Sequence, residues 1–416
     1  MRAQVSLENV KKAAILLSDV ALKTPLMRNE NLAQKFSSNI VLKREDLQQV
    51  RSYKIRGAYN KIASLSQDQL NRGVVCASAG NHAQGVAFSC FKLKVKGVVF
   101  MPTPTPKQKI EQVKMFGGAF IEIVITGDTF DDASFSAKEY CADNKMSFVH
   151  PFDDEKVIEG QATIALEILE QSKDEIDYLF LPVGGGGVAA GMSSIFNELS
   201  PNTKVIGIEP SGAPSMSTSL ENGVNVKLDH IDKFVDGASV QRVGDLNFDL
   251  CQQYLSSMAL VKEGEVCQTI LDLYNKDAIV VEPAGALTIA ALNQFKDEIQ
   301  GKNIVCLVSG SNNDITRTEE IKERALLHAN LKHYFIISFP QRSGALKEFV
   351  ADVLGPNDDI TYFEFSKKSF RPNTTALVGI EVLKVTDYQR LVDSMKSHNF
   401  KFDYLNNKQS LFEFLI

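Results

Sequence analysis

The nine residues Ser52–Asn60 read SYKIRGAYN and place Lys54 among apolar and aromatic neighbours. A lysine in such surroundings is poorly solvated as an ammonium ion, so its neutral amine becomes accessible. A neutral amine can form a Schiff base with an aldehyde cofactor. The alternative is an ordinary solvated lysine at a helix start, and this stretch alone does not separate the two.

A run of four glycines, Gly184, Gly185, Gly186 and Gly187, follows an apolar stretch that we expect to be a strand. Glycines let the backbone approach a ligand without side chains in between. Their N–H groups, together with the start of the next helix, make a site for phosphate. The run matches neither of the common glycine patterns for dinucleotides or ATP. The alternative is a flexible turn.

Two further polar loops follow expected strands. In the first, Ser78 and Asn81 stand at a helix start, where they could hold a carboxylate or, through Asn81, donate to a phenolic oxygen. The alternative is a simple helix cap, and His82 is expected to be structural. In the second, Ser309 could hydrogen-bond a ring nitrogen, and the alternative is an ordinary turn. Glu282, before a proline, could merely cap a helix.

Composition limits the classes of function. The chain has 416 residues, enough for two or three domains, and a formal net charge of −6 without a basic run, which argues against nucleic acid. The apolar runs are shorter than the roughly 18 residues that span a membrane. The six cysteines are scattered, without metal spacing, and the N-terminus lacks the pattern of a signal peptide. We therefore expect a cytoplasmic protein.

Strands and helices alternate along most of the chain, which predicts parallel strands buried on both faces. Ligands of such sheets bind at the carboxyl ends of strands, where the polar loops above lie. The expected strands span 40–43, 73–77, 97–101, 120–125, 147–150, 178–183, 204–208 and 304–308, and the expected helices 6–19, 82–93, 106–116, 129–144, 157–171 and 188–199.

The composition changes after about residue 320. A charged helical connector, 321–332, precedes strand, helix, strand, strand, helix and strand, which is the order of a ferredoxin-like module. We expect these at 333–339, 343–354, 360–367, 374–382, 386–398 and 401–405, with a short strand at 411–416.

Taken together, the motifs resemble those of the pyridoxal-phosphate β-eliminating enzymes of the tryptophan-synthase-β fold, and most closely the shorter biosynthetic threonine dehydratases. The likeness covers nearly the whole chain and rests on Ser52–Ala58, Ser78–Gly85, Gly184–Gly187, Glu282–Ala286 and Ser309–Gly310. It implies an α/β catalytic domain, 1–320, of the two-lobed fold type II, with a small lobe at about 49–150. It also implies an α+β regulatory domain, 333–416, of the ACT-like type, carried by the segment Phe339–Leu346.

The resemblance also implies roles for single residues toward pyridoxal 5'-phosphate. Lys54 forms the Schiff base and acts as catalyst, Asn81 contacts the phenolic oxygen, and Ser309 faces the pyridine nitrogen. The glycines Gly184 to Gly187 hold the phosphate. The loop of Ser78, Ala79, Gly80, Asn81 and His82 binds the substrate.

The chain departs from the family pattern at a few positions. Tyr53 stands where phenylalanine is common, and Ser311 makes the last loop less typical. Glu209 resembles part of a cation site of related racemases, but Ser215 stands where the last carboxylate is expected. We therefore predict no metal.

As function, the resemblance implies a lyase that converts L-threonine to 2-oxobutanoate and ammonia, the first step of isoleucine biosynthesis. Its single regulatory domain favours feedback inhibition by isoleucine in a homo-oligomer, either a dimer or a tetramer. The alternatives are a serine dehydratase, a serine racemase or a β-replacement enzyme of the same fold, and a non-catalytic amino-acid sensor. No nucleic acid or membrane is expected as partner.

Overall fold

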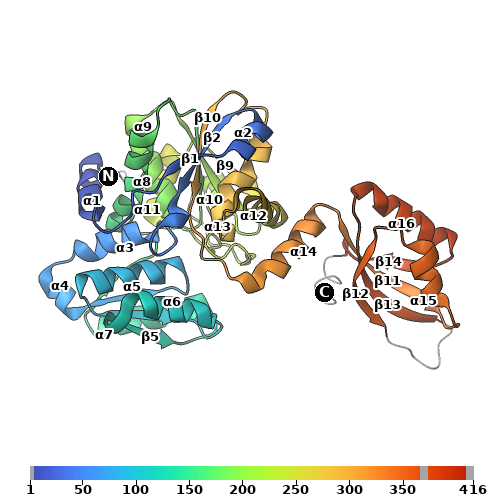
Figure 1. Ribbon diagram of the computed structural model, residues 1–416. Coiled ribbons are helices and arrows are strands. Elements are labelled where there is room, and N and C mark those ends of the chain that lie inside the picture. The colour runs from blue at the N-terminus through green and yellow to red at the C-terminus, as the bar shows by residue number, and fades with distance from the viewer. Residues whose placement is uncertain (1–3, 366–372, 409–416) are drawn as a thin grey trace. The chain divides into compact units, whose positions relative to one another are not determined.

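The computed structural model describes residues 4–365 and 373–408 (Figure 1). The contacts divide the chain into two compact units, Met1–Asp314 and Ile315–Ile416. The first unit holds two sheets and all the residues for which the sequence predicted chemistry, and the second holds the expected ferredoxin-like module.

The larger sheet of the first unit has six strands, in the order β1-β2-β10-β7-β8-β9. All neighbours pair in parallel except β1, which runs antiparallel to β2. The strands are β1 Leu26–Arg28, β2 Asn39–Arg44, β7 Tyr178–Pro182, β8 Lys204–Pro210, β9 Ser257–Val261 and β10 Asn303–Val308. The expected parallel sheet is confirmed, while β1 and β9 were not predicted.

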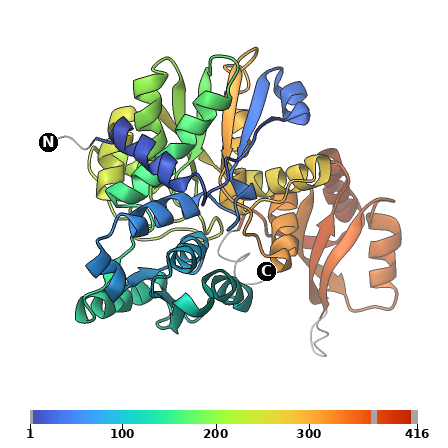
Figure 2. The ribbon, with the colours of Figure 1, turned by 60° about the vertical axis from the view of Figure 1, so that its left-hand side comes forward.

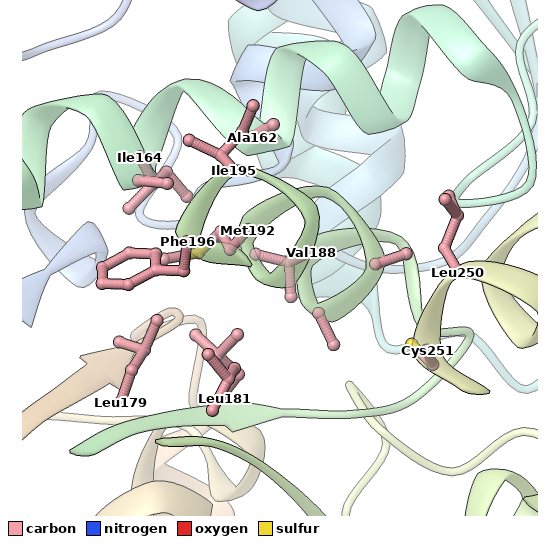
Figure 3. Close-up of a cluster of buried hydrophobic side chains, with 14 of the residues drawn as sticks. Ala162, Ile164, Leu179, Leu181, Val188, Met192, Ile195, Phe196, Leu250 and Cys251 are labelled. Carbon is pink, nitrogen blue, oxygen red and sulfur yellow. The ribbon is translucent and has the colours of Figure 1, made fainter. Parts of the chain in front are cut away.

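Strand β7 shows why its sequence is apolar throughout. Leu179 and Leu181 pack into the core that also contains α8 (Glu155–Gln171) and α9 (Gly187–Leu199), as Figure 3 shows. Phe180, which points to the other face, packs edge-on against Phe295. Both faces of the strand are therefore covered, and α13 (Pro283–Ala290) contacts it on the side away from α9.

The smaller sheet belongs to a lobe of its own beside the larger sheet (Figure 2). Its four parallel strands follow the order β5-β4-β3-β6. They are β3 Val74–Ala77, β4 Gly97–Met101, β5 Ile121–Ile125 and β6 Ser147–Phe148, with helices α5 Asn81–Leu93, α6 Lys107–Gly117 and α7 Phe130–Asp143. Helix α3 (Lys54–Ala63) packs on both α5 and α8, so it connects this lobe to the larger one.

The other helices of the first unit are α1 Leu7–Leu17, α2 Glu30–Phe36, α4 Gln67–Arg72, α10 Ser215–Asn222, α11 Asp245–Tyr254 and α12 Glu263–Asp277. All strands and helices expected between residues 6 and 308 are present, with ends that differ by at most two residues. The six cysteines are buried, none of them forms a disulfide, and all of them precede residue 314. Within the described residues, no helix is both long and apolar enough to cross a membrane.

The second unit begins with α14 (Thr318–His328) and continues as an antiparallel sheet in the order β12-β13-β11-β14. The strands are β11 Lys332–Pro340, β12 Asp359–Phe365, β13 Asn373–Glu381 and β14 Lys401–Tyr404, and α16 spans Val385–Ser397. The helix expected at 343–354 is a short α15, Ala345–Glu348, followed by a π-helical turn, Phe349–Val353. The strand expected at 411–416 and the end of the one expected at 360–367 lie outside the described residues.

Candidate active site

Lys54 is the first residue of α3, and its side chain is half-buried. The amine donates a hydrogen bond to the carbonyl oxygen of Pro151 at 2.9 Å and lies 5.5 Å from the centre of the Tyr53 ring. Burial lowers the pKa of Lys54 to about 8, against the attraction of the Glu282 carboxylate. With that pKa, roughly a tenth of this amine is neutral at pH 7, far more than of an ordinary lysine, in line with the expectation from its apolar neighbours.

The four glycines form the turn from β7 into α9. Gly186 has a φ of +93° and precedes the first residue of α9, whose start has no side-chain cap from the described residues. The backbone N–H groups of the first helical turn are thus available for an anion. A Cβ atom on Gly184 would lie 2.8 Å from the backbone of Ala238, so the close packing requires glycine there.

Two residues that the sequence did not single out hold the glycine turn. The ring of Phe152 packs so tightly on Gly185 that a Cβ atom there would lie 2.2 Å from the ring. The amide of Asn247 donates to the carbonyl oxygens of Gly185, at 2.8 Å, and Phe152, at 3.1 Å. These contacts hold the glycine turn against Phe152 and Asn247.

Asn81 opens α5 but does not cap it, because the N-cap position is Gly80. Its Nδ2 donates to Oε1 of Glu282 at 2.7 Å, and its Oδ1 accepts from Nδ2 of Asn312 at 2.5 Å. Glu282 is the N-cap residue of α13, yet its side chain bonds Asn81 instead of the helix. Burial, followed by repulsion from Asp236, raises the pKa of Glu282 to about 7.

Ser309 follows β10, as expected, and is 2% exposed. Its backbone oxygen accepts from the N–H of Tyr53, so the end of β10 lies next to Lys54. Its hydroxyl has no hydrogen-bond partner among the described residues. A buried hydroxyl without a partner is costly, which suits a group that waits for a ligand.

One narrow cavity joins several of these groups. Lys54, Asn81, Gly184 and Ser309 line it together with Tyr53, Pro182, Gly237, Ala238, Glu282 and Ala284. A pyridoxal phosphate needs an amine for its aldehyde, donors for its phenolic oxygen and phosphate, and a partner for its ring nitrogen. The residues present fit that group, although the cavity, at about 20 Å³, must widen to admit it.

Ser78, Ala79, Gly80 and His82 do not line this cavity. The Ser78 hydroxyl accepts from the N–H of Gly80 at 3.2 Å, which orders the loop. His82 is buried with Nε2 2.8 Å from the carbonyl oxygen of Val149, and burial lowers the pKa of His82 to about 3. A side chain that stays neutral and bonded to the backbone has a structural function.

Glu209 is fully buried at the end of β8. Its carboxylate accepts from the N–H groups of Met216 and Ser217, at 2.7 and 2.9 Å, and from the Ser217 hydroxyl at 2.8 Å. These donors belong to the first turn of α10, so Glu209 serves as a partner of that helix start. The described residues include no group of three or more His, Cys, Asp or Glu arranged to hold a metal ion.

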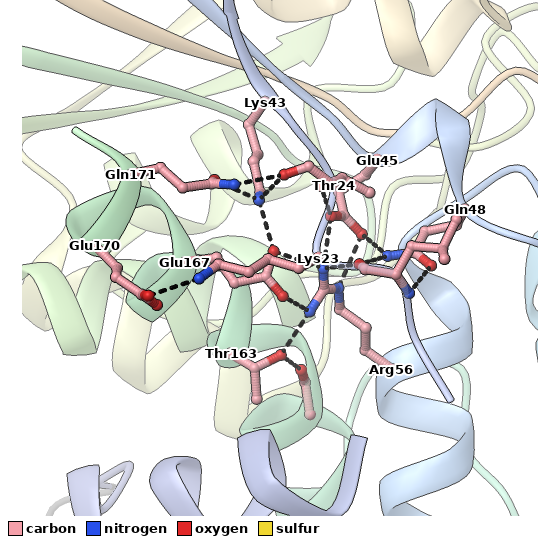
Figure 4. A network of polar contacts seen from close by, with 12 residues as sticks. Lys23, Thr24, Lys43, Glu45, Gln48, Arg56, Thr163, Glu167, Glu170 and Gln171 are labelled. Carbon is pink, nitrogen blue, oxygen red and sulfur yellow. Dashed lines mark hydrogen bonds and ion pairs between the residues drawn. The ribbon is translucent and has the colours of Figure 1, made fainter. Parts of the chain in front are cut away.

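A buried ionic network lies two residues beyond Lys54 (Figure 4). The guanidinium of Arg56, which is 1% exposed, bonds the carboxylates of Glu45 and Glu167 and the hydroxyl of Thr163. Lys43 also bonds Glu167, at 2.6 Å. Because Glu45 follows β2 and Glu167 lies on α8, the network fixes the start of α3 to the larger lobe. The spacing of these residues along the chain does not indicate this network.

Two families match the chain. Residues 17–310 match the pyridoxal-phosphate dependent enzymes, and residues 323–415 match the C-terminal regulatory domain of threonine dehydratase. The fold, the site and these matches define a pyridoxal-phosphate-dependent enzyme of fold type II with an added regulatory domain.

Relatives narrow the class further. The L-threonine dehydratase biosynthetic IlvA of Halalkalibacterium halodurans is 53% identical over 99% of this chain and 100% of its own length. The processed form of threonine deaminase isoform 2 from Solanum lycopersicum has a TM-score of 0.73 at 39% identity, over 78% of this chain and 96% of that one. The serine racemase from Dictyostelium discoideum has a TM-score of 0.69 at 31% identity, over 75% and 99%. The chain belongs to the family of biosynthetic threonine dehydratases, which are pyridoxal-phosphate-dependent ammonia-lyases.

Proposed function

We propose that this enzyme converts L-threonine to 2-oxobutanoate and ammonia and that isoleucine inhibits it through the second unit. One observation carries the catalytic part: the amine of Lys54, with a pKa of about 8, lies in the same cavity as Asn81, Gly184 and Ser309. The cofactor requires an amine for its aldehyde, donors for its phenolic oxygen and its phosphate, and a partner for its ring nitrogen. These four residues provide that set of groups.

Each residue then has a defined task. Gly184 to Gly187 and the start of α9 hold the phosphate, Asn81 donates to the phenolic oxygen, and Ser309 faces the ring nitrogen. The loop from Ser78 to His82 orders the substrate carboxylate. When bound, pyridoxal phosphate supplies an aldehyde for the amine and a ring that takes up the electron pair left at Cα.

Lys54 has two successive tasks in this scheme. Its amine would hold the cofactor through the aldehyde group. The free, neutral amine then removes the Cα proton as a general base, which its lowered pKa allows. Ser309 is a neutral partner and does not keep the ring nitrogen fully protonated, which limits side reactions such as transamination.

The second unit supports the regulatory part of the proposal. A cavity of about 440 Å³ lies between the turn 341–347 and the sheet, with the aromatic side chains of Phe339, Phe363 and Phe365 on its wall. Aromatic walls suit a branched aliphatic side chain. Lys347 at the turn provides positive charge near it for a carboxylate, whereas Arg342 there is paired with Glu348. Isoleucine has both groups.

A substrate panel tests the catalytic part. The full chain, loaded with pyridoxal phosphate, is given L-threonine, L-serine or O-acetyl-L-serine, with and without isoleucine, and keto acid and ammonia are measured. We expect the highest kcat/KM with threonine, lower rates with isoleucine, and no turnover for Lys54→Ala. A preference for serine, formation of D-serine or a β-replacement product would favour the alternative enzymes. A purified protein without cofactor binding would favour the amino-acid sensor.

We also propose a homo-oligomer, either a dimer or a tetramer, whose conformational equilibrium isoleucine shifts. Sedimentation of the enzyme loaded with pyridoxal phosphate gives its molecular mass and therefore the number of subunits. All six cysteines are buried and form no disulfide, which supports a reducing compartment such as the cytoplasm.

A further inference from the structure

Glu282 is a buried carboxyl group in the candidate active site to which the proposed function gives no task. It lines the same cavity as Lys54 and is 4% exposed. Burying a carboxyl group is costly, and the cost is visible in its raised pKa of about 7. A helix cap does not explain it, because the side chain makes no bond to α13.

The bonds around Glu282 form a chain whose direction is fixed. It begins at the carbonyl oxygen of Val50, which can only accept and therefore receives Nδ2 of Asn312, at 3.0 Å. The same Nδ2 donates to Asn81 at 2.5 Å, so the Asn81 atom that faces it must be Oδ1. Nδ2 of Asn81 consequently faces Glu282, at 2.7 Å.

The carboxyl group of Glu282 is held on its other sides as well. The backbone N–H of Asn312 bonds it, and a Cβ atom on Gly310 would lie 2.5 Å from Oε1. The backbone N–H of Glu282 donates to the carbonyl oxygen of Gly310 at 3.2 Å. The oxygen that receives Asn81 is therefore fixed in position.

We propose that Glu282 is a positioning residue that orients the carboxamide of Asn81 toward the cofactor. An amide nitrogen has two N–H donors. One of those of Asn81 is taken by Glu282, and the orientation imposed from both ends leaves the other for the phenolic oxygen. This inference rests on the proposed function and adds a residue that acts on the cofactor only through Asn81.

Substitution of Glu282 by glutamine distinguishes the orientation of the Asn81 carboxamide from simple packing of the side chain. Glu282→Gln keeps the size of the side chain but leaves one acceptor oxygen for two donors, Asn81 and the backbone N–H of Asn312. One of them then faces an NH2 group, so the orientation of Asn81 is lost. The matched control is Glu159→Gln on α8, where a carboxylate that is 6% exposed accepts from Nδ2 of Asn9 at 2.9 Å, away from the cavity.

The experiment compares the wild type, Glu282→Gln, Asn81→Ala, the double variant and the control, each titrated with pyridoxal phosphate. The readouts are the dissociation constant, the ratio of the absorption bands of the bound cofactor, which responds to hydrogen bonding at the phenolic oxygen, and kcat. We expect Glu282→Gln to change the band ratio and to lower kcat roughly 10- to 100-fold, the range of one hydrogen bond to a charged group. In the Asn81→Ala variant, the further substitution Glu282→Gln should change the band ratio and kcat little.

Three results would overturn the inference: an unchanged band ratio in Glu282→Gln, effects of the two substitutions that simply multiply, or an equal effect of Glu159→Gln. If Glu282→Gln does not fold, Asn312→Ala removes the donor at the other end of Asn81 and must change the band ratio in its place. A wild type that binds no pyridoxal phosphate would instead overturn the proposed function itself.

Discussion

The ionisation of the Lys54 amine sets the pH at which this site can capture an aldehyde. Only the neutral amine attacks, and burial lowers the pKa of Lys54 to about 8. The amine is therefore charged and unreactive well below pH 8 and becomes reactive as the pH rises through that value. An ordinary lysine becomes reactive only near pH 10.4.

This predicts the pH dependence of cofactor capture. When pyridoxal phosphate is added to cofactor-free protein, the rate of the absorption change should rise with pH and level off above about 8. Stopped-flow absorbance measures it, with a free alkylamine in the same buffers as the control. A rate that keeps rising toward pH 10 would contradict the assigned environment of Lys54, and Lys54→Ala should show no covalent capture.

Arg56 gives a second prediction for a single residue. Arg56→Met would leave the buried carboxylate of Glu45 without its ion-pair partner and would leave Glu167 with Lys43 alone, so we expect a loss of roughly 3–5 kcal/mol in the free energy of unfolding. Urea unfolding followed by circular dichroism measures the loss. The control is Lys12→Met, which removes the exposed Lys12–Glu8 pair and should leave the unfolding midpoint in place. Equal midpoints for both variants would contradict the importance of the network.

The sequence alone predicted those candidate residues that stand at the ends of elements. Lys54 begins α3, and the glycine run and Ser309 follow β7 and β10, where the local pattern indicates a ligand site. The partner of Asn81 could not be found in this way, because Glu282 lies 201 residues further along the chain. The same holds for Asn247, whose bond to the glycine turn depends on tertiary packing alone.

At the scale of the elements, the turn between β7 and α9 combines a backbone requirement with a binding task. Gly186 adopts a φ of +93°, and a Cβ atom there would also lie 2.9 Å from Asn247. An L-residue in this conformation is strained by about 1–3 kcal/mol. The strain distorts the backbone that we propose holds the phosphate.

Gly186→Ala should therefore lower both stability and the affinity for pyridoxal phosphate, the latter at least about tenfold, as expected from loss of one charge-assisted hydrogen bond. Fluorescence titration measures the affinity. The matched control is Gly301→Ala, where φ is +70° and no heavy atom lies within 4 Å of the added Cβ. The control should lose stability but keep its affinity. An equal loss of affinity in both variants would show that the turn has no special task.

The alternation of apolar strands and amphipathic helices predicted most elements well, because β7 and β10 are buried on both faces. It failed for β1, a three-residue strand at the sheet edge, which is too short for a periodic pattern. It also failed to foresee the π-helical turn after α15, in which the N–H of Leu354 donates to the carbonyl oxygen of Phe349, five residues earlier, and from which Phe349 and Val353 enter the core.

At the scale of the whole molecule, catalysis and regulation belong to separate units, so they should respond to different substitutions. Phe363 lines the cavity of the second unit, whereas Tyr362 beside it on β12 packs on Tyr334. Phe363→Ala should weaken inhibition by isoleucine about tenfold, the value of a few buried methylene groups, without changing the uninhibited kcat. Tyr362→Ala serves as the control.

Inhibition curves with isoleucine, measured on the loaded full-length enzyme, provide the readout. A parallel shift of the curve for Phe363→Ala alone supports the cavity as the effector site. If both variants respond like the wild type, isoleucine either binds elsewhere or is not the effector.

The cysteines are distributed unequally between the two units. All six thiols are enclosed in the first unit, and burial raises the pKa of Cys76, Cys251 and Cys306. Thiolates are the nucleophiles that attack alkylating reagents, so the native enzyme resists alkylation until the first unit opens. The second unit contains no cysteine. The mass gained during a timed pulse of iodoacetamide therefore reports the opening of the first unit only. The rate of alkylation thus measures the unfolding of the catalytic unit without an engineered label.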